Sequence, residues 1–447
     1  MSYPNSSDVI AGQATEAAQY NNLRSDALYL GGDAATSGNM RALLYQYRGP
    51  LSLQRNGSAG IVLNASEDAP VSMMIGGAIR SVSASQNVTV DASVYTDVCR
   101  LYLFAAADSA GGFTLKIAES AVERSGTRLI GSFLWSGDGI IPGTLRTAAE
   151  MEITAAASVP SLNEGRLSYI AGEPVPDSDI SLGTTLYFTP CVGNRVSLYL
   201  GGAWETFTFS ELSLPVGGLL RMVPYDVFIQ ADAAGLALSC SCWGTASARP
   251  SGMLSRVDGI LVSAADPGKR YLGSFALNSE GYGADSRTER LLWNVSNRAP
   301  RPLLSKLSAD AEGVYHTNVW APYFDDDAPE VTVLIPSADT EFELEGVGIS
   351  SVVLSTDLTS TRAFALGIGR DMVKSEPYTG NTTAVPVFTH TRGNAPIRVR
   401  IFNSDASFQG LHTYTLSAWT NASLTPAGTE FRSTAGECPG LIGAVRS

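Results

Sequence analysis

The chain has 447 residues, of which 44% are hydrophobic and 16% charged, with 43 acidic against 30 basic side chains and a net charge of −13. This length predicts two to four domains. The acidic balance excludes general nucleic-acid binding, because phosphate contacts need basic side chains. No stretch approaches the roughly 20 apolar residues of a membrane helix, and the first residues lack a signal-peptide pattern. We therefore expect a chain without membrane insertion, made in a cytoplasm.

Residues 1–38 differ in composition from the rest of the chain. A helix is predicted from about Ala14 to Tyr29, after a candidate cap at Ser7-Asp8, and Gly31-Gly32 ends it. Its apolar stripe would comprise Ala17, Tyr20, Leu23, Ala27 and Leu28. The segment is either an ordinary helix packed on the first domain or a docking segment with a partner of its own.

Residues 39–165 have the pattern of an antiparallel β domain. Short apolar runs alternate with Gly, Pro, Asn and Asp at the spacing of strands and turns, which is typical of a sandwich or barrel. Within this domain, Tyr102 to Ala106 and Phe113 to Ile117 are predicted to form two strands joined by a Gly-containing turn.

Residues 166–303 are predicted to form a second β domain. Val196, Leu198 and Leu200 alternate with other residues in the period of a half-buried strand. Gly201-Gly202 then supplies a two-residue turn, because both positions can take a positive φ, and the chain returns from Ala203 to Phe209.

Short sequence segments that match between the two β domains, and occur in the same order in both, suggest that the second domain repeats the first. The matched segments are Ala107–Gly111 with Ala231–Gly235, Arg128–Phe133 with Arg270–Phe275, and Arg146-Thr147 with Arg287-Thr288. The offset between the copies changes once, so the second copy should carry an insertion between Trp243 and Asp266. Chance similarity is the alternative, since each match is short. We expect the two copies to share one topology.

Residues 304–447 are predicted to form a C-terminal β-sandwich. Ile397, Val399 and Ile401 face one way and Arg398 and Arg400 the other, as in a half-buried strand. The predicted fold class is therefore mainly β, with several antiparallel sandwich or jelly-roll-like domains in tandem and a short N-terminal helix.

A longer pattern runs from Leu186 to Leu303. It begins LYFTP and NRVSLYLGGAWETFTF, continues with RYLGSF, and ends DSRTERLLWNVSNRAPRPL. Taken alone, the last part indicates two short strands and a rigid stop at Pro300 and Pro302, because proline cannot donate to a sheet ladder. The whole pattern resembles one found in tail-fibre-like and other virion proteins of tailed bacteriophages. The runs DVIAGQATEAAQYNNLRSDALYLG and GLHTYTLSAWTNASLT resemble, less specifically, the two ends of such appendages.

The resemblance implies a virion structural protein: a tail fibre, spike or decoration component assembled in the host cytoplasm. Residues 1–38 would dock on other virion proteins, and the C-terminal β domain would be exposed for host attachment, with a surface glycan or protein as candidate partner. The alternative is a cellular surface adhesin or a string of carbohydrate-binding modules.

The sequence also predicts association of copies. Sheets of many short strands leave edges that need covering, and aromatic residues occur along the β units, namely Trp204, Trp243, Trp320, Tyr323 and Trp419. The residues indicate a homo-oligomer, and the resemblance to fibres implies a trimer.

We predict no catalytic, cofactor-binding or metal-binding residues and no enzymatic activity, since common nucleotide, zinc and serine-hydrolase motifs are missing. Asp325-Asp326-Asp327 could hold a cation, although Ca²⁺ loops space their ligands alternately. A solvated loop is the competing interpretation. Paired carboxylates for glycoside cleavage stay open, because they need proximity only in space.

Histidine and cysteine give equally weak signals. His316, His390 and His412 are far in the sequence from Cys240 and Cys242, and His316 and His412 are better explained as surface or core histidines than as general bases. Cys240 and Cys242 would point to one face of a strand, but two further ligands for a metal are missing nearby. We expect the five cysteines to be structural, buried thiols.

Overall fold

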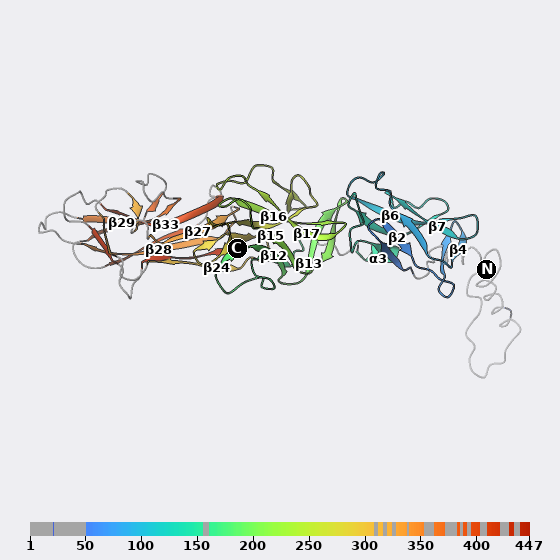
Figure 1. Ribbon diagram of the computed structural model, residues 1–447, viewed down its shortest axis with the longest axis horizontal. Coiled ribbons are helices and arrows are strands. Elements are labelled where there is room, and N and C mark those ends of the chain that lie inside the picture. The colour runs from blue at the N-terminus through green and yellow to red at the C-terminus, as the bar shows by residue number, and fades with distance from the viewer. Residues whose placement is uncertain are drawn as a thin grey trace, which may run out of the picture. The chain divides into compact units, whose positions relative to one another are not determined.

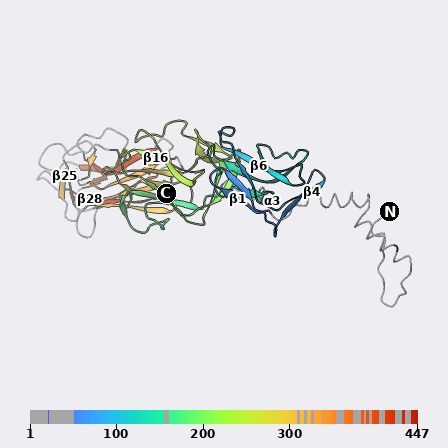
Figure 2. The ribbon, with the colours of Figure 1, turned by 45° about the vertical axis from the view of Figure 1, so that its right-hand side comes forward.

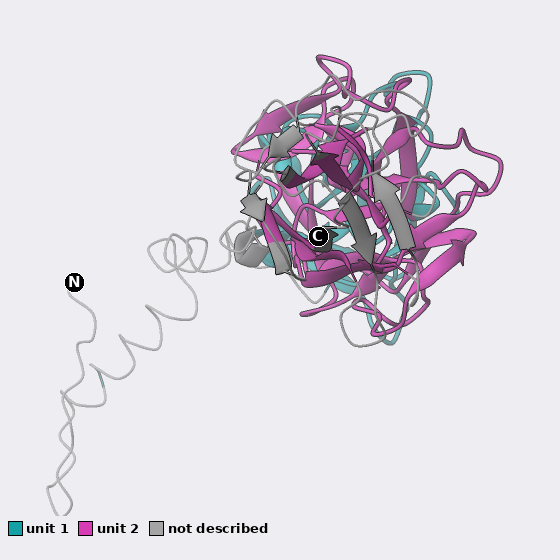
Figure 3. Ribbon diagram, turned by 90° about the vertical axis from the view of Figure 1, so that its left-hand side faces the viewer, with its two compact units in different colours: residues 1–158, 200–203, 232–235 teal, residues 159–199, 204–231, 236–447 magenta. Residues whose placement is uncertain are grey.

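The computed structural model describes Asn21 and residues 51–154, 161–307, 312–315, 320–323, 328–337, 339–352, 362–371, 382–384, 388–390, 395–402, 409–420, 429–432 and 439–447. These residues form a mainly β protein with several antiparallel sheets, as predicted (Figure 1). The chain divides into two compact units, shown in Figure 3: residues 1–158, 200–203 and 232–235, and residues 159–199, 204–231 and 236–447. The helix predicted at 14–29 lies outside the described part except for Asn21, which is helical.

The first unit contains a small β-sandwich. One sheet has the order β1-β2-β5, a second has the order β7-β6-β8-β9, and β3 pairs with β4. The strands are β1 (Leu53–Asn56), β2 (Gly60–Leu63), β3 (Val71–Ile75), β4 (Ala78–Val82), β5 (Gln86–Thr89), β6 (Cys99–Ala107), β7 (Phe113–Ala118), β8 (Thr127–Trp135) and β9 (Arg146–Thr147). The helix α3 (Ala148–Thr154) follows. Alternate residues of β6, such as Leu101, Leu103 and Ala105, point into a core that also holds Phe133 and Trp135.

The second unit begins with the same topology. Its sheets have the orders β10-β12-β15 and β17-β16-β20, with β23 on the far side of β20, and β13 pairs with β14. The strands are β10 (Gly165–Ser168), β12 (Thr185–Pro190), β13 (Arg195–Leu200), β14 (Ala203–Thr208), β15 (Leu212–Pro215), β16 (Pro224–Asp232), β17 (Gly235–Cys242), β20 (Arg270–Ala276) and β23 (Leu292–Asn294). Each strand of the first sandwich therefore has a counterpart in chain order.

The register confirms the correspondence between β6–β8 and β16–β20. Leu103 pairs with Gly131, and the register then shifts by one residue so that Phe104 faces Leu129. In the second copy Val227 pairs with Gly273, and the same shift brings Phe228 opposite Tyr271. A β-bulge displaces one residue from the ladder and is fixed by local packing. Its occurrence at the same place in both copies supports the predicted common topology.

The insertion in the second copy lies where the sequence predicts it. A hairpin of β18 (Leu254–Val257) and β19 (Ile260–Ser263) extends the sheet through pairing of Val262 with Arg270. The match of Arg146-Thr147 with Arg287-Thr288 is wrong, because the strand that pairs with β20 in the place of β9 is β23. Another match was missed: Val71-Ser72 to Gly76-Gly77-Ala78 corresponds to Val196-Ser197 to Gly201-Gly202-Ala203. Both pairs of glycines have φ between 57° and 82°.

Two further sheets form the C-terminal sandwich. One has the order β24-β35-β28-β34-β25, with β32 also on β28, and the other β11-β21-β22-β27-β33-β29-β30. The first comprises β24 (Pro300–Lys306), β25 (Glu312–Tyr315), β28 (Phe342–Val352), β32 (Ala395–Phe402), β34 (Thr429–Arg432) and β35 (Gly440–Arg446). The second comprises β11 (Ile180–Gly183), β21 (Gly283–Asp285), β22 (Glu289–Arg290), β27 (Glu330–Ile335), β29 (Arg362–Arg370), β30 (Thr382–Ala384) and β33 (Gly410–Thr420), with β26 (Ala321–Pro322) and β31 (Phe388–His390) at its sides.

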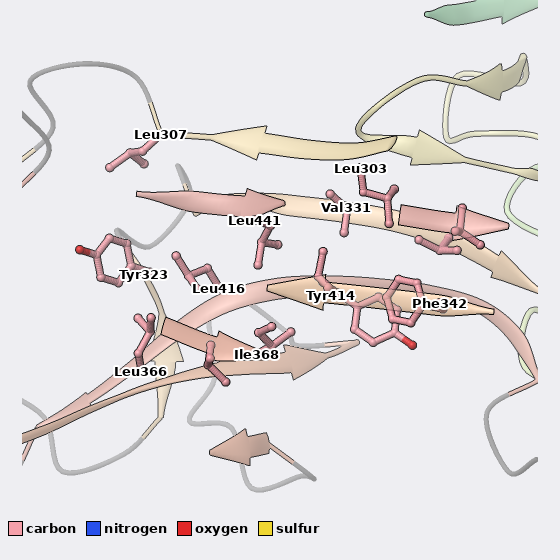
Figure 4. Packing of buried hydrophobic residues seen from close by; sticks show 14 of the residues in the cluster. Leu303, Leu307, Tyr323, Val331, Phe342, Leu366, Ile368, Tyr414, Leu416 and Leu441 are labelled. Atoms are coloured by element: carbon pink, nitrogen blue, oxygen red, sulfur yellow. The ribbon is translucent and has the colours of Figure 1, made fainter. Parts of the chain in front are cut away.

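Side chains from both sheets meet in one apolar layer (Figure 4). Val331 and Leu416 come from one sheet and Leu441 and Phe342 from the other, and all are almost fully buried. Strands whose alternate residues are apolar bury one face each, and burial of that surface is the main favourable term for a sandwich of this kind.

This second sheet is continuous across the boundary predicted at residues 303 and 304. β22 pairs in parallel with β27 through Glu289 and Thr332, so strands from both predicted domains share hydrogen bonds. Residues 159–447 accordingly form one compact unit apart from the two hairpin tips. The boundary predicted at 165 and 166 falls inside β10, whereas the first unit ends at residue 158.

The expectation that the β structure stops at Pro300 and Pro302 is wrong. Both prolines lie in β24, where Pro300 pairs with Arg446 and Pro302 with Ala444, so the C-terminus lies beside this strand (Figures 1 and 2). β24 is the terminal strand of its sheet. An edge strand tolerates proline, because the missing N–H can face away from the neighbouring strand.

Candidate functional site

The predicted candidates of the C-terminal part do not form a site within the described residues. Asp325-Asp326-Asp327 and His316 lie outside them, and only the backbone of His390 is described, in β31. In the described ranges no three His, Cys, Asp or Glu side chains gather in the manner of a metal site. No described helix has the length and apolar character to cross a membrane.

His412 is a core histidine with one carboxylate partner. Its side chain is 9% exposed, and Nδ1 lies 2.7 Å from Oδ2 of Asp371. Burial of Asp371 would raise its pKa, but hydrogen bonds from His412 and from the Thr413 N–H hold that pKa below its usual value. The pair links the end of β29 to β33, which supports the structural interpretation.

The four described cysteines differ from the prediction in their burial, and Cys438 lies outside the described residues. Cys99, Cys191, Cys240 and Cys242 are free thiols and are half-buried rather than buried. β17, which carries Cys240 and Cys242, is the terminal strand of its sheet, so one side of the strand stays open. Desolvation still raises the pKa of the Cys240 thiol.

The aromatic residues expected at an oligomer surface belong largely to cores. Tyr323 is fully buried, Trp243 is 2% exposed and Trp204 is 7% exposed. Trp204 donates its indole N–H to Asp258, and Trp243 donates to Asp226. These side chains therefore contribute stability to the single chain and supply little surface for association.

A buried ionic cluster accounts for the charged residues of the long motif. Asp285 lies 2.7 Å from Arg290 and 3.0 Å from Arg301, and all three side chains are at most 6% exposed. Arg290 also donates to the carbonyl of Pro302, and Arg301 donates to the carbonyl of Pro176. The cluster joins β21 and β22 to the edge strand of the sandwich.

The amides of the motif hold the second β copy in place. Asn294 accepts a hydrogen bond from the N–H of Leu167 and donates to its carbonyl. Asn297, in a left-handed conformation with φ 55°, donates to the carbonyls of Asn163 and Gly165. Side chains of this part of the motif thus bond to neighbouring strands and to the backbone rather than presenting themselves to a ligand.

Arg166 adds a link to the C-terminus. Its guanidinium donates to the carbonyls of Asn297 and Ser447, at 3.1 and 2.8 Å, and also to that of Pro174. Desolvation lowers its pKa from the usual value. A buried guanidinium needs most of its five donors satisfied, and here backbone carbonyls provide the partners.

A second buried network surrounds Asp226. This carboxylate is fully buried and accepts hydrogen bonds from Trp243, Ser274 and Arg249. Arg249 lies over the Trp243 ring, 4.6 Å from its centroid, and donates to the carbonyl of Pro336. Arg249 is thereby fixed between the second β copy and the sandwich.

Arg249 of this second network also lines a cavity of about 670 Å³ within the second unit. Its lining is Ser161, Arg249, Leu254, Arg256, Gly259, Ile260, Leu261, Arg270, Tyr271, Trp293, Val295, Ser296, Arg298, Ser337 and Asp339. We call this the hairpin cavity, because five of these residues belong to the β18–β19 hairpin or its turn. Four arginines face one aspartate, so the lining is cationic in an acidic protein.

The arginines of the hairpin cavity differ in how their charge is compensated. Arg298 pairs with Asp339 at 2.7 Å and lies over the Trp293 ring at 4.5 Å from its centroid. Arg270 donates to the carbonyls of Leu162 and Ser197, and burial lowers its pKa to about 10, so it is charged at neutral pH. Arg256 is exposed and donates to the carbonyl of Gly259.

Sequence reasoning missed the hairpin cavity. Its lining comes from four stretches around residues 161, 249–271, 293–298 and 337–339, and no local spacing brings these together. The one sequence signal that points to the cavity is the predicted insertion between Trp243 and Asp266, because residues of that insertion form one wall of the cavity.

Comparison with known proteins gives little further information. No family model matches the sequence, and no curated protein matches it. Similar solved structures include one of the infectious bursal disease virus Gt strain, with TM-score 0.19 and 10% identity over 89% of this chain and 68% of that one. Particles of T=1 symmetry derived from the same virus give TM-score 0.15 and 11% identity, over 65% and 76%.

An exo-β-1,3-galactanase from Phanerochaete chrysosporium with galactose gives TM-score 0.13 and 8% identity, over 88% and 95% of the two chains. At these TM-scores none of the three likenesses carries an argument about fold or function. The interpretation therefore rests on the chain's own residues.

Proposed function

We propose that the chain is a non-enzymatic structural component of a phage virion, of the tail-fibre, spike or decoration type. Residues 1–38 dock on the particle, and the C-terminal sandwich is exposed and contributes to host attachment. The observation that supports this most is the use of the long motif: Asp285, Arg290, Asn294, Asn297 and Arg301 bond inward to strands and backbone.

Side chains that bond to neighbouring strands and backbone in this way suit a mechanical role. Two β copies of one topology are followed by a sandwich, and the last copy shares a sheet and a buried ionic cluster with that sandwich. A shared sheet resists bending more than a flexible linker does, because motion would break a row of ladder hydrogen bonds. The junction is therefore suited to transmit load or to hold the sandwich at a fixed orientation to the second copy.

Assembly of particles from the full chain and from a chain starting at Asn39 tests this proposal. Particles are purified, and the protein is detected by mass spectrometry and by antibody labelling in the electron microscope. We expect the full chain in the particles and the shortened chain folded but excluded. Particles that take up both chains equally contradict docking through residues 1–38, whereas particles without the full chain contradict a virion role altogether.

The alternative, a cell-surface adhesin, is separated by the same antibody. Labelling on the surface of the producing cell, with none on particles, supports an adhesin.

A further inference from the structure

We propose that Cys240 and Cys242 form a two-thiolate site for a soft metal ion of low coordination number, Cu⁺, on the terminal strand of their sheet. Such an ion is held by two sulfur ligands, so the two further ligands that zinc would require are not needed. This inference concerns the second β copy alone and does not depend on a role in a virion.

The first argument is the placement of the two thiols on one strand. β17 runs from Gly235 to Cys242, and side chains two residues apart on a strand point to the same face. The burial of the strand agrees, because Ser241 is exposed while Cys240 and Cys242 on either side of it are half-buried. With a rise of about 3.3 Å per residue, the two Cα atoms lie about 6.6 Å apart. The thiols therefore stand side by side.

This spacing favours a bridging ion over a disulfide. Disulfides most often join Cα atoms about 5.5–6 Å apart, and both cysteines are free thiols. A sulfur–sulfur bond of about 2.05 Å would draw the strand out of its extended form. Two sulfur–metal bonds of roughly 2.3 Å, the length known for zinc, hold two sulfurs up to about 4.6 Å apart. That separation suits alternate positions of an extended strand.

The two thiols also act on each other and on one hydroxyl. Desolvation raises the pKa of the Cys240 thiol, and the charge of Cys242 raises it further. Burial raises the pKa of Tyr225, and a hydrogen bond with Cys242 adds to this rise. The N–H of Gly244 donates to the Cys242 sulfur at 3.3 Å. Two neighbouring thiolates repel each other, so a cation between them is favoured, and its binding releases the thiol protons.

The surroundings select the kind of ion. β17 is the terminal strand of its sheet, which leaves an open side for entry. The part of the chain that the structure describes brings no third His, Cys, Asp or Glu to the pair in the manner of a metal site. Zn²⁺ takes four ligands, whereas Cu⁺ accepts two, and thiolates prefer soft ions over Mg²⁺ or Ca²⁺. Cu⁺ therefore fits the pair better than these other ions.

The test is titration of the reduced full chain with Cu⁺ under anaerobic conditions, in competition with the chromogenic chelator bicinchoninate. We expect the chain to take up one Cu⁺ at this site, and Cys240→Ser and Cys242→Ser each to weaken the affinity at least a hundredfold. Zn²⁺ should bind more weakly than Cu⁺. The X-ray absorption spectrum of the copper-loaded parent, which needs no substitution, should show two sulfur neighbours.

The matched control is Cys99→Ser, because Cys99 is another half-buried thiol whose pKa burial raises, but it lies in the first copy. Thermal unfolding of the metal-free variants checks that each is folded. The proposal is overturned if the parent takes no Cu⁺ from the chelator, if its copper has an oxygen or nitrogen shell, or if Zn²⁺ binds as tightly. It is equally overturned if either Ser variant of the pair binds like the parent, or if Cys99→Ser weakens binding as much as they do.

Discussion

The carboxylate of Asp285 lies 3.0 Å from the guanidinium of Arg301, and the two side chains are 3% and 6% exposed. Asp285 ends β21, and Arg301 belongs to β24, so the pair connects strands of different sheets. The same carboxylate also binds Arg290. Asp179 adds a second carboxylate 3.9 Å from Arg290, so the loss of Asp285 removes the nearer carboxylate of Arg290 and the carboxylate that pairs with Arg301.

Replacement Asp285→Asn should destabilise the second unit by about 3–5 kcal/mol, the range for breaking a buried ion pair at one partner. The expected result is a lower denaturant midpoint for this unit, measured by tryptophan fluorescence. Arg398→Gln is the control, because Arg398 pairs with Glu345 but is 73% exposed. Such a surface pair contributes at most about 1 kcal/mol. Equal effects of the two substitutions would contradict the role given to Asp285.

The glycines at the bulges of the two copies offer a paired prediction. A Cβ at Gly131 would overlap the carbonyl oxygen of Arg146, and one at Gly273 would overlap that of Trp293. In each copy a leucine of the first strand, Leu53 or Leu167, lies beside the same position. Gly131→Ala and Gly273→Ala should each cost about 1–3 kcal/mol through overpacking.

The control for these glycines is Gly217→Ala, since a Cβ there meets nothing within 4 Å. Calorimetric scans of the three variants give the comparison. If either bulge substitution leaves its unit as stable as Gly217→Ala does, the equivalence of the two bulges fails.

The sequence was sufficient for features fixed by short-range chemistry. Gly201-Gly202 forces a two-residue turn, and the alternation of Val196, Leu198 and Leu200 sets the buried face of the strand before it. The segments Arg128–Phe133 and Arg270–Phe275 reveal the repeat because each contains a glycine, Gly131 or Gly273, at the bulge against the neighbouring strand. These predictions depend on neighbours along the chain or on one adjacent strand.

The features that the sequence does not predict depend on backbone groups that are far away along the chain. The prolines of β24 predict that a strand ends there, unless the strand is known to lie at the edge of a sheet. That position follows only from the sheet order, in which β24 is terminal and pairs with β35. Arg270 is held by carbonyls of Leu162 and Ser197. Every residue has a carbonyl, so no residue type reveals such a partner. The hairpin cavity was missed for the same reason.

The Asp371–His412 pair predicts a pH effect. The folded pKa of Asp371 is lowered: burial acts against ionisation, but the hydrogen bonds from His412 and Thr413 outweigh it. A lowered carboxylate pKa adds stability above the unfolded pKa of about 3.9, and that stability is lost as the pH falls through the folded pKa. Asp371→Asn should therefore flatten the dependence of the urea midpoint on pH below about pH 4. Curves for variant and parent that run parallel in this range would count against the pair.

Association of copies is the remaining prediction. The surface now expected to mediate it differs from the aromatic residues named from the sequence. Because Trp204, Trp243 and Tyr323 are buried, we turn to sheet edges with exposed apolar side chains among the described residues. β11 ends its sheet and carries Leu182, which is 68% exposed. An exposed edge strand with an apolar side chain is a template for pairing. We expect Leu182→Lys to weaken association, and Val122→Lys, at a site 70% exposed in the first unit, to leave it unchanged.

The expected oligomer is a trimer, because three copies around one axis close a ring in which each meets the next by the same pair of patches. Light scattering of the purified chain at micromolar concentration measures this directly. A single chain has a mass of 47.0 kDa, and the trimer should scatter as three times that mass. A dimer or hexamer would keep association and exclude the trimer. A monomer at that concentration would exclude association through β11 and leave Leu182 as an ordinary exposed leucine.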